Sequence, residues 1–174
     1  PKKIYASGGQ GVNFLDFEQC GESADIDDHA FVVIDYDNGI RGNFTLNMFC
    51  HDFTEEMVIC GDRGRLVTRE IFNIHQQKPS SATVALELGE LGGSKQTEVT
   101  YAREIESSGH HGATYYEHIA FVDQLEGNLS TSATPLQGLW SIIIACAAQQ
   151  SIATGEAVEI DQFLADNKLS EFTQ

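Results

Sequence analysis

Basic side chains are scarce in this sequence. Its 174 residues include 10 Lys and Arg against 26 Asp and Glu, a formal net charge of −16 at pH 7. A surface of that sign repels the phosphates of nucleic acids and the head groups of anionic lipids. We therefore expect no nucleic acid and no membrane among the partners of this chain.

Cysteine and long apolar runs are also limited. The four cysteines lie far apart and form no C-x-x-C pair, which argues against a compact disulfide framework or a cysteine-based zinc site. We expect free thiols and a cytoplasmic location, with two disulfide bridges as the alternative. The longest mostly apolar run, 139–148, has ten residues including Ser141, whereas a membrane-spanning helix needs roughly 20. No signal-peptide pattern opens the chain.

Several catalytic motifs are missing. The sequence has no H-E-x-x-H metal motif and no G-x-S-x-G nucleophile turn. Gly9 and Gly11 follow a short apolar stretch, but Phe14 stands where a dinucleotide fingerprint needs a small residue, and acidic residues come next. We interpret 8–14 as a flexible glycine turn, with phosphate binding as the weaker alternative. We predict no cofactor or metal site in this chain.

A run of short strands from 28 to 70 is the feature around which the chain is organised. Asn38-Gly39 lies between two apolar stretches and predicts a type I′ hairpin turn, in which both residues have positive φ. After this turn apolar and polar residues alternate, which predicts a strand with one packed face and one polar face. The segment therefore predicts a meander of four strands.

Strands predominate before residue 107 and helices after it. Short strands are expected at 71–75, 83–88, 96–101 and 157–160, and an edge strand at 2–6. Helical spacing predicts a helix over 113–126, and a capping box with Thr134, Pro135 and Gln137 opens a second helix that ends at Gly155. The second helix is apolar on nearly every side, so we expect it to be covered on both sides. We predict an α+β fold, 1–174 as a single domain, with two main helices packed on one face of an open, mostly antiparallel sheet.

Two groups of polar residues are candidates for binding. His110 and His111 lie between glycines at a predicted helix N-terminus, where free backbone N–H groups favour a polar or anionic ligand. An ordinary loop and a metal site are the alternatives for this pair. The polar face of the strand after Asn38-Gly39 is either solvent-exposed sheet or an interaction surface, and it carries Arg41, Asn43, Thr45 and Asn47.

Two segments resemble the C-terminal domain of the Gfo/Idh/MocA oxidoreductase family. The first is 28–70, whose strand, Asn-Gly turn and strand are followed by E-x-x-x-x-x-G-x-x-G-R-L from Glu55 to Leu66. The second is the closing pattern His110-x-Gly112, Phe121-Val122-Asp123, Gly127, Gly138-Leu139-Trp140 and Thr154-Gly155. The resemblance spans roughly residues 28 to 165.

The resemblance implies one half of a two-domain enzyme. Its partner would be an N-terminal Rossmann domain that holds NAD or NADP, and the reaction would be hydride transfer at a hydroxyl or ketone carbon of a sugar, inositol or related polyol. The family's Glu-Lys-Pro motif is absent here, so we expect the catalytic residues upstream and this chain alone to be inactive. His110, His111 and Tyr115 would contact the substrate. The face with Arg41, Asn43, Thr45 and Asn47 would join a homo-oligomer.

Two alternatives stay open. The chain is either a fragment, as its abrupt start at Pro1 suggests, or a stand-alone binding or scaffold domain of the same fold without catalysis. A nicotinamide-dependent glycosidase of the same family is a further alternative. The substrate, the choice between NAD and NADP and the oligomeric state are not fixed by the sequence.

Overall fold

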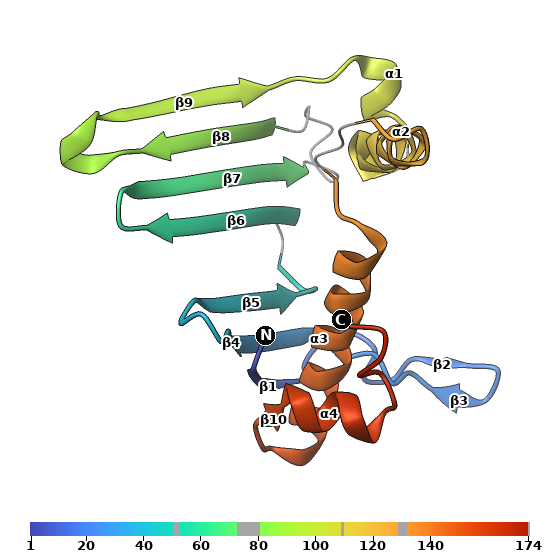
Figure 1. Ribbon diagram of the computed structural model, residues 1–174. Helices are drawn as coiled ribbons and strands as arrows, with labels where there is room; N and C mark the ends of the chain where they lie inside the picture. The colour runs from blue at the N-terminus through green and yellow to red at the C-terminus, as the bar shows by residue number, and fades with distance from the viewer. Residues whose placement is uncertain (51–52, 73–80, 109, 129–131, 174) are drawn as a thin grey trace. The chain divides into compact units, whose positions relative to one another are not determined.

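The structure is a computed structural model, and it describes the chain except residues 51–52, 73–80, 109, 129–131 and 174. The chain divides into two compact units. Unit 1 comprises Pro1–Phe49 with Ala133–Gln174, and unit 2 comprises Cys50–Ser132. Both units contain antiparallel strands and α-helices (Figure 1). The predicted α+β class is confirmed.

Unit 1 contains a four-stranded antiparallel sheet in the order β10-β1-β4-β5. Its strands are β1 (Lys3–Gly9), β4 (His29–Asp35), β5 (Arg41–Asn47) and β10 (Val158–Glu159). The prediction of an edge strand at 2–6 is wrong, because β1 lies between β10 and β4. The pairing of Ile4 with Val158 joins residues from opposite ends of the chain. Local sequence patterns carry no signal for such a pairing.

One face of this sheet forms the core of unit 1. Alternate residues of β1 and β4 are buried: Ile4, Ala6, Ala30, Val32 and Ile34. They pack in one cluster with α3 (Pro135–Thr154) and α4 (Ile160–Asp166), which contribute Ile143, Ala147, Ala148, Phe163 and Leu164. Ser151 of α3 is fully buried; its Oγ accepts a hydrogen bond from the N–H of Ala6 at 2.8 Å and donates to the carbonyl of Glu156 at 2.7 Å. This polar contact fixes α3 on the sheet.

The predicted ends of α3 are confirmed. The Thr134 side chain accepts from the N–H of Gln137, whose side chain in turn accepts from the N–H of Thr134. Gly155 ends the helix with a φ of +73°. Unit 1 itself covers this helix on one side only, since Ile142 is 63 % exposed. By length and composition alone α3 could cross a membrane, but core helices pass the same test.

Unit 2 contains a second antiparallel sheet in the order β6-β7-β8-β9. Its strands are β6 (Phe53–Gly61), β7 (Gly64–Phe72), β8 (Ser81–Glu87) and β9 (Ser94–Val99). The four strands predicted from 28 to 70 are all present, but β4 and β5 belong to unit 1, whereas β6 and β7 belong to unit 2. The helices of unit 2 are α1 (Arg103–Glu106) and α2 (Ala113–Leu125), with 3₁₀ turns η1 (Gly89–Leu91) and η2 (His110–Gly112). No described residue of α2 is buried.

The hairpin between β4 and β5 differs in detail from its prediction. Gly39 has a φ of +84° but Asn38 does not have a positive φ, so the turn is not type I′. The N–H of Gly39 donates to the carbonyl of Tyr36 at 3.1 Å, and the Asn38 side chain accepts from the N–H of Ile40. The loop is therefore one residue longer, with the glycine alone in the left-handed region.

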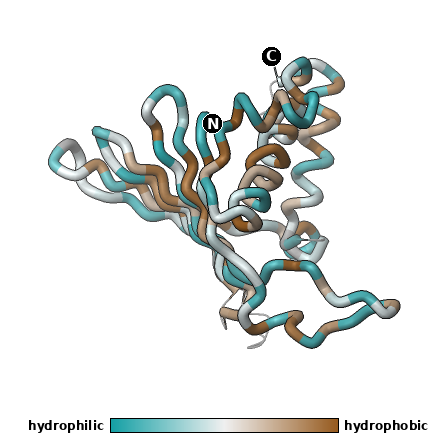
Figure 2. The backbone as a smooth tube through the Cα atoms, turned by 90° about the horizontal axis from the view of Figure 1, so that it is seen from below, coloured by the Kyte–Doolittle hydropathy of each residue, from teal (hydrophilic) through white to brown (hydrophobic). Residues whose placement is uncertain are grey.

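An arm over residues 10–28 extends from unit 1 between β1 and β4, and the sequence did not predict it as a structured element. It contains the short strands β2 (Glu18–Gln19) and β3 (Glu22–Ser23). Figures 1 and 2 show it reaching away from the sheet, with hydrophobic and hydrophilic segments mixed along its length. Asp28 holds the base of the arm by accepting hydrogen bonds from the N–H groups of residues 11–13.

Candidate functional site

The histidine pair lies at the start of α2, as predicted. It forms the 3₁₀ turn η2, which leads directly into the helix. His110 is exposed and has a φ of +49°, a left-handed conformation that is uncommon outside glycine. Gly112 has a φ of +96°, and a Cβ there would lie 2.9 Å from Cγ2 of Ile105. Only glycine fits at this position, so the turn is closely packed on α1. The side chain of His111 lies outside the described residues.

A shallow hollow opens beside this turn within unit 2. It is lined by Ser108, Thr114, Tyr115 and His118. Of the sequence-predicted substrate residues, only Tyr115 is among them. His118 lies next to both Thr114 and Tyr115 on α2, because residues three and four positions apart are neighbours on a helix surface. That spacing was the available signal for His118, which the sequence analysis did not single out.

The tautomer of His118 is fixed by its own helix. Its Nδ1 lies 2.7 Å from the carbonyl oxygen of Thr114. A carbonyl oxygen can only accept, so Nδ1 carries the proton and Nε2 of the neutral ring is an acceptor. Ser108 donates its hydroxyl to the carbonyl of Ile105 at 2.6 Å, which leaves its lone pairs as acceptors. The hollow therefore offers acceptors at His118 and Ser108, and hydroxyl groups at Thr114 and Tyr115 that can donate or accept.

Three tyrosines form a continuous aromatic group next to the hollow. The rings of Tyr115 and Tyr116 meet edge to face, with centroids 5.4 Å apart, and Tyr116 meets Tyr101 at 5.6 Å. Edge-to-face contacts are the favoured geometry for such pairs. Each ring is 40 to 45 % exposed. Tyr115 thus presents a supported aromatic surface to the solvent.

A second polar arrangement lies at the base of the arm in unit 1. Asp28 is fully buried and accepts hydrogen bonds from the N–H groups of Gly11 at 2.9 Å, Val12 at 2.7 Å and Asn13 at 2.6 Å. It also accepts from Nδ1 of His29 at 2.8 Å. Burial alone would raise the pKa of Asp28, but the hydrogen bonds from His29 and from the three backbone N–H groups outweigh it and hold that pKa well below its usual range.

This arrangement bears on the interpretation of the glycine turn. The N–H groups of residues 11–13, which a bound phosphate would require, already donate to a carboxylate of the same chain. The turn is held in place by Asp28 instead of being free. The sequence analysis did not single out Asp28 or His29, whose only signal was an acidic residue beside a histidine at the start of a strand.

The predicted polar face of β5 is present in unit 1. Arg41, Asn43 and Thr45 are exposed and pair across β4 with Asp35, Val33 and Phe31, while Asn47 pairs with His29. Two of these side chains have local partners: Arg41 forms an ion pair with Asp35 at 3.0 Å, and Asn47 accepts from the N–H of Phe49 at 3.1 Å. The centre of the same face is apolar, because Tyr5, Phe31 and Val33 are 47, 56 and 48 % exposed.

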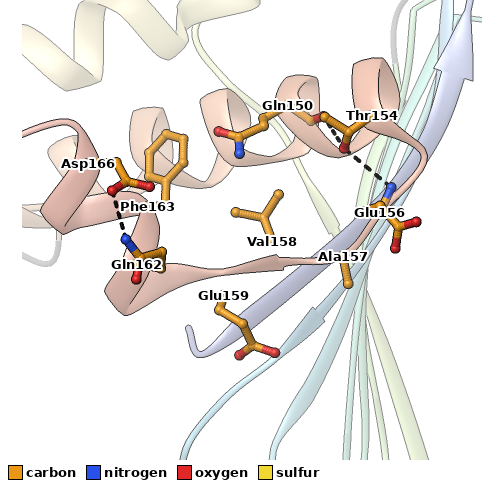
Figure 3. A pocket seen from close by; sticks show the side chains of 9 residues that line it. All are labelled: Gln150, Thr154, Glu156, Ala157, Val158, Glu159, Gln162, Phe163 and Asp166. Carbon is orange, nitrogen blue, oxygen red and sulfur yellow. Dashed lines mark hydrogen bonds between the residues drawn. The ribbon is translucent and has the colours of Figure 1, made fainter.

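A further hollow lies in unit 1 between the end of α3, β10 and α4 (Figure 3). Val158 and Phe163 supply apolar lining. Some of its polar side chains are paired: Gln162 donates to Asp166 at 2.7 Å, and Glu159 pairs with Lys3. None of the sequence-predicted residues lines it. Within the described residues, no group of three or more His, Cys, Asp or Glu side chains is placed to hold a metal ion.

Comparison with protein families decides what this chain is. Residues 7–160 match the model of the Gfo/Idh/MocA oxidoreductase family, C-terminal alpha/beta domain. The chain belongs to this family. The match includes residues of both units and begins earlier in the chain than the segment in which the resemblance was recognised. A comparison with curated proteins finds no match.

Solved structures share the fold of this family member. A candidate oxidoreductase from Klebsiella pneumoniae is 15 % identical, with a TM-score of 0.54 over 100 % of this chain and 47 % of its own. A candidate NADPH-dependent oxidoreductase from Desulfitobacterium hafniense is 14 % identical, with a TM-score of 0.55 over 94 % of this chain and 43 % of its own. A candidate oxidoreductase from Bacteroides fragilis is 14 % identical, with a TM-score of 0.51 over 91 % of this chain and 47 % of its own. The chain thus spans less than half of each of these proteins.

Proposed function

We propose that this chain is the substrate-binding and oligomerisation part of an NAD(P)-dependent oxidoreductase. The observation that carries the proposal is the family match over residues 7–160. The share of 43 to 47 % of the similar solved chains supports a partner domain in the working protein. That partner is an N-terminal Rossmann domain, which binds NAD or NADP.

The turn at 8–14 does not fit the pyrophosphate of a nicotinamide cofactor. The glycine turn that would cradle a pyrophosphate donates its N–H groups to Asp28, and a buried carboxylate repels a second anion. We therefore assign the cofactor and the catalytic residues to the partner domain. This chain alone is inactive, and its own residues bind and orient the substrate.

The substrate is a sugar, an inositol or a related polyol that exchanges a hydride with the nicotinamide at a hydroxyl or ketone carbon. His110, His111 and Tyr115 contact it from the start of α2. Hydrogen bonds from such groups favour a hydroxylated substrate, because an analogue without the hydroxyl leaves a polar group unpaired. The hollow beside Tyr115, with its acceptors, supports this role.

The outer face of the unit 1 sheet joins a second copy of the chain. Its apolar centre of Tyr5, Phe31 and Val33 supports the proposal, as does its local charge balance: Arg41 is paired with Asp35, and Lys3 with Glu159. In a chain of net charge −16, a locally neutral face lets two copies approach with the least repulsion. We also place the protein in the cytoplasm, which its four free, exposed cysteines support.

The test is nucleotide reduction by the natural protein that contains this chain, with a panel of polyols and both NAD⁺ and NADP⁺. We expect turnover with one class of polyol, and at least a tenfold loss of kcat/KM in His110→Ala or His111→Ala. Lys95→Ala, on the exposed strand β9, is the control. No nucleotide binding by the natural protein would favour the alternative, a binding or scaffold domain without catalysis. If turnover is unchanged in both histidine variants, η2 is not part of the substrate site.

A further inference from the structure

We propose that the hollow beside His118 selects neutral, ring-shaped polyols, with Tyr115 as its stacking surface and His118 as its hydroxyl acceptor. The inference rests on the proposed function and narrows its substrate class. It adds His118 and Thr114 to the residues that contact the ligand, and assigns Tyr116 and Tyr101 as positioning residues.

The preference for a neutral ligand follows from the lining. Ser108, Thr114, Tyr115 and His118 carry hydroxyl groups and one imidazole, and none of the four is a lysine or arginine. A phosphorylated or carboxylated sugar needs a cation to offset the loss of its hydration. The surrounding chain, at −16, adds repulsion to any anion. A sugar phosphate or a sugar acid is therefore a poor ligand here.

The preference for hydroxyl donors follows from the tautomer of His118. Because Nδ1 donates to the Thr114 carbonyl, Nε2 accepts. The lone pairs of Ser108 also remain as acceptors after its bond to Ile105. A polyol hydroxyl donates to such groups, whereas an ether or a methylated hydroxyl cannot. His118→Gln retains an acceptor, the amide oxygen, and His118→Leu does not.

The preference for a ring follows from the tyrosine group. Tyr115 is 43 % exposed, and its ring is supported edge to face by Tyr116, with Tyr101 behind. One face of a pyranose or inositol ring is lined by C–H groups, whose partial positive charge is attracted to the negative face of an aromatic ring. An open-chain polyol has no such fixed face and must give up rotational freedom on binding.

The experiment is saturation-transfer NMR and calorimetric titration of the natural protein with four probes. Methyl glucoside and myo-inositol are the neutral rings, sorbitol is the open chain, and glucose 6-phosphate is the anion. We expect saturation to pass from tyrosine ring protons to a neutral ring, with sorbitol and glucose 6-phosphate bound at least tenfold more weakly. Tyr115→Leu and His118→Leu should each weaken the neutral ring about tenfold, and His118→Gln should restore most of the affinity. Phe121→Leu, an exposed aromatic on the same helix, is the matched control and should change it less than about twofold.

The opposite results overturn the proposal. They are sorbitol or glucose 6-phosphate bound as tightly as the rings, no binding of either ring at millimolar concentration, or affinities that Tyr115→Leu and His118→Leu leave unchanged. The proposed function is tested separately by nucleotide reduction. If the natural protein oxidises polyols while Tyr115→Leu and His118→Leu keep their affinity for the rings, the proposed binding site is wrong and the proposed function is supported. If rings bind through Tyr115 and His118 but no nucleotide is reduced, the proposed binding site is supported and the proposed oxidoreductase function is wrong.

Discussion

Nδ1 of His29 lies 2.8 Å from Oδ1 of Asp28, and that carboxylate has no exposed surface. Three backbone N–H groups at the base of the arm donate to the same side chain. One acidic residue thereby joins the start of β4 to the loop that follows β1. Because these N–H groups are occupied, the glycine turn has none of them left for a phosphate.

Asp28→Asn should destabilise the protein at pH 7. An asparagine amide replaces one acceptor oxygen with an NH₂ group, which cannot accept from the backbone N–H groups that now face it. We expect the melting temperature to fall by about 5 °C or more, measured by circular dichroism. Asp16→Asn, in the exposed part of the same arm, is the control. An equal effect of the two variants would show that the hydrogen bonds of Asp28 do not matter for stability.

The same residue predicts a pH dependence. The pKa of Asp28 is lowered in the folded protein, so its contribution is fully present above the ordinary carboxyl pKa of about 3.9. It is lost as the pH falls from there toward the folded-state pKa. The stability difference between wild type and Asp28→Asn should therefore shrink as the pH falls below about 4. Denaturant unfolding at each pH measures it, and a difference that persists or grows in acid would contradict the assignment.

Gly112→Ala should cost more than Gly127→Ala. Both glycines have positive φ, at +96° and +75°, so both substitutions strain the backbone by about 1 kcal/mol. A Cβ at 112 also meets Ile105, whereas one at 127 meets nothing within 4 Å. We expect Gly112→Ala to lose a further 1–3 kcal/mol or so by overpacking, in chemical denaturation. Equal losses would mean that η2 is not packed on α1 as described.

Ser151→Ala tests the contact between α3 and β1. The N–H of Ala6 loses its side-chain acceptor in a fully buried position, which costs about 1–3 kcal/mol. Ser141 lies on the same helix, is exposed and bonds only its own helix in the contact described. Ser141→Ala should change the free energy of unfolding by less than about 0.5 kcal/mol. If the two variants lose the same stability, the buried hydrogen bond is not what holds α3.

Val33→Glu tests the proposed oligomer face. It places a charge in the apolar centre between Tyr5 and Phe31 of unit 1, and two copies would then bring like charges together. We expect the natural protein to lose its oligomer in light scattering coupled to size exclusion. Val12→Glu is the control, since Val12 is 60 % exposed on the arm. If Val33→Glu forms the same oligomer as the wild type, the interface does not include this face of the sheet.

Local patterns predicted most elements of this fold. The capping box of α3 depends on residues a few positions apart and is confirmed. A strand is also present at β5, but Phe44 on its predicted packed face is 55 % exposed. The central position of β1 was not predictable, because Ile4 pairs with Val158 from the other end of the chain. The Asn38-Gly39 turn was predicted in place but not in type, because the Asn38 side chain bonds Ile40 and stabilises a longer loop.

Fewer residues of the candidate site than of the fold could be predicted from the sequence. The histidine turn was correctly located at a helix start, but which side chains line the hollow depends on helix orientation and not on proximity in sequence. Tyr115 and His118 share a side of α2, whereas His110 does not line the hollow. Asp28 was missed because its role depends on N–H groups some 15 residues earlier in the chain.

The most direct test of the account is a titration with NADH and NADPH, followed by nicotinamide fluorescence, of the natural protein and of residues 1–174 alone. We predict that the natural protein binds one of the two cofactors and that residues 1–174 alone bind neither at millimolar concentration. Tight binding by residues 1–174 would contradict the assignment of the cofactor to a partner domain. No binding by the natural protein would contradict the assignment of this chain to a working oxidoreductase.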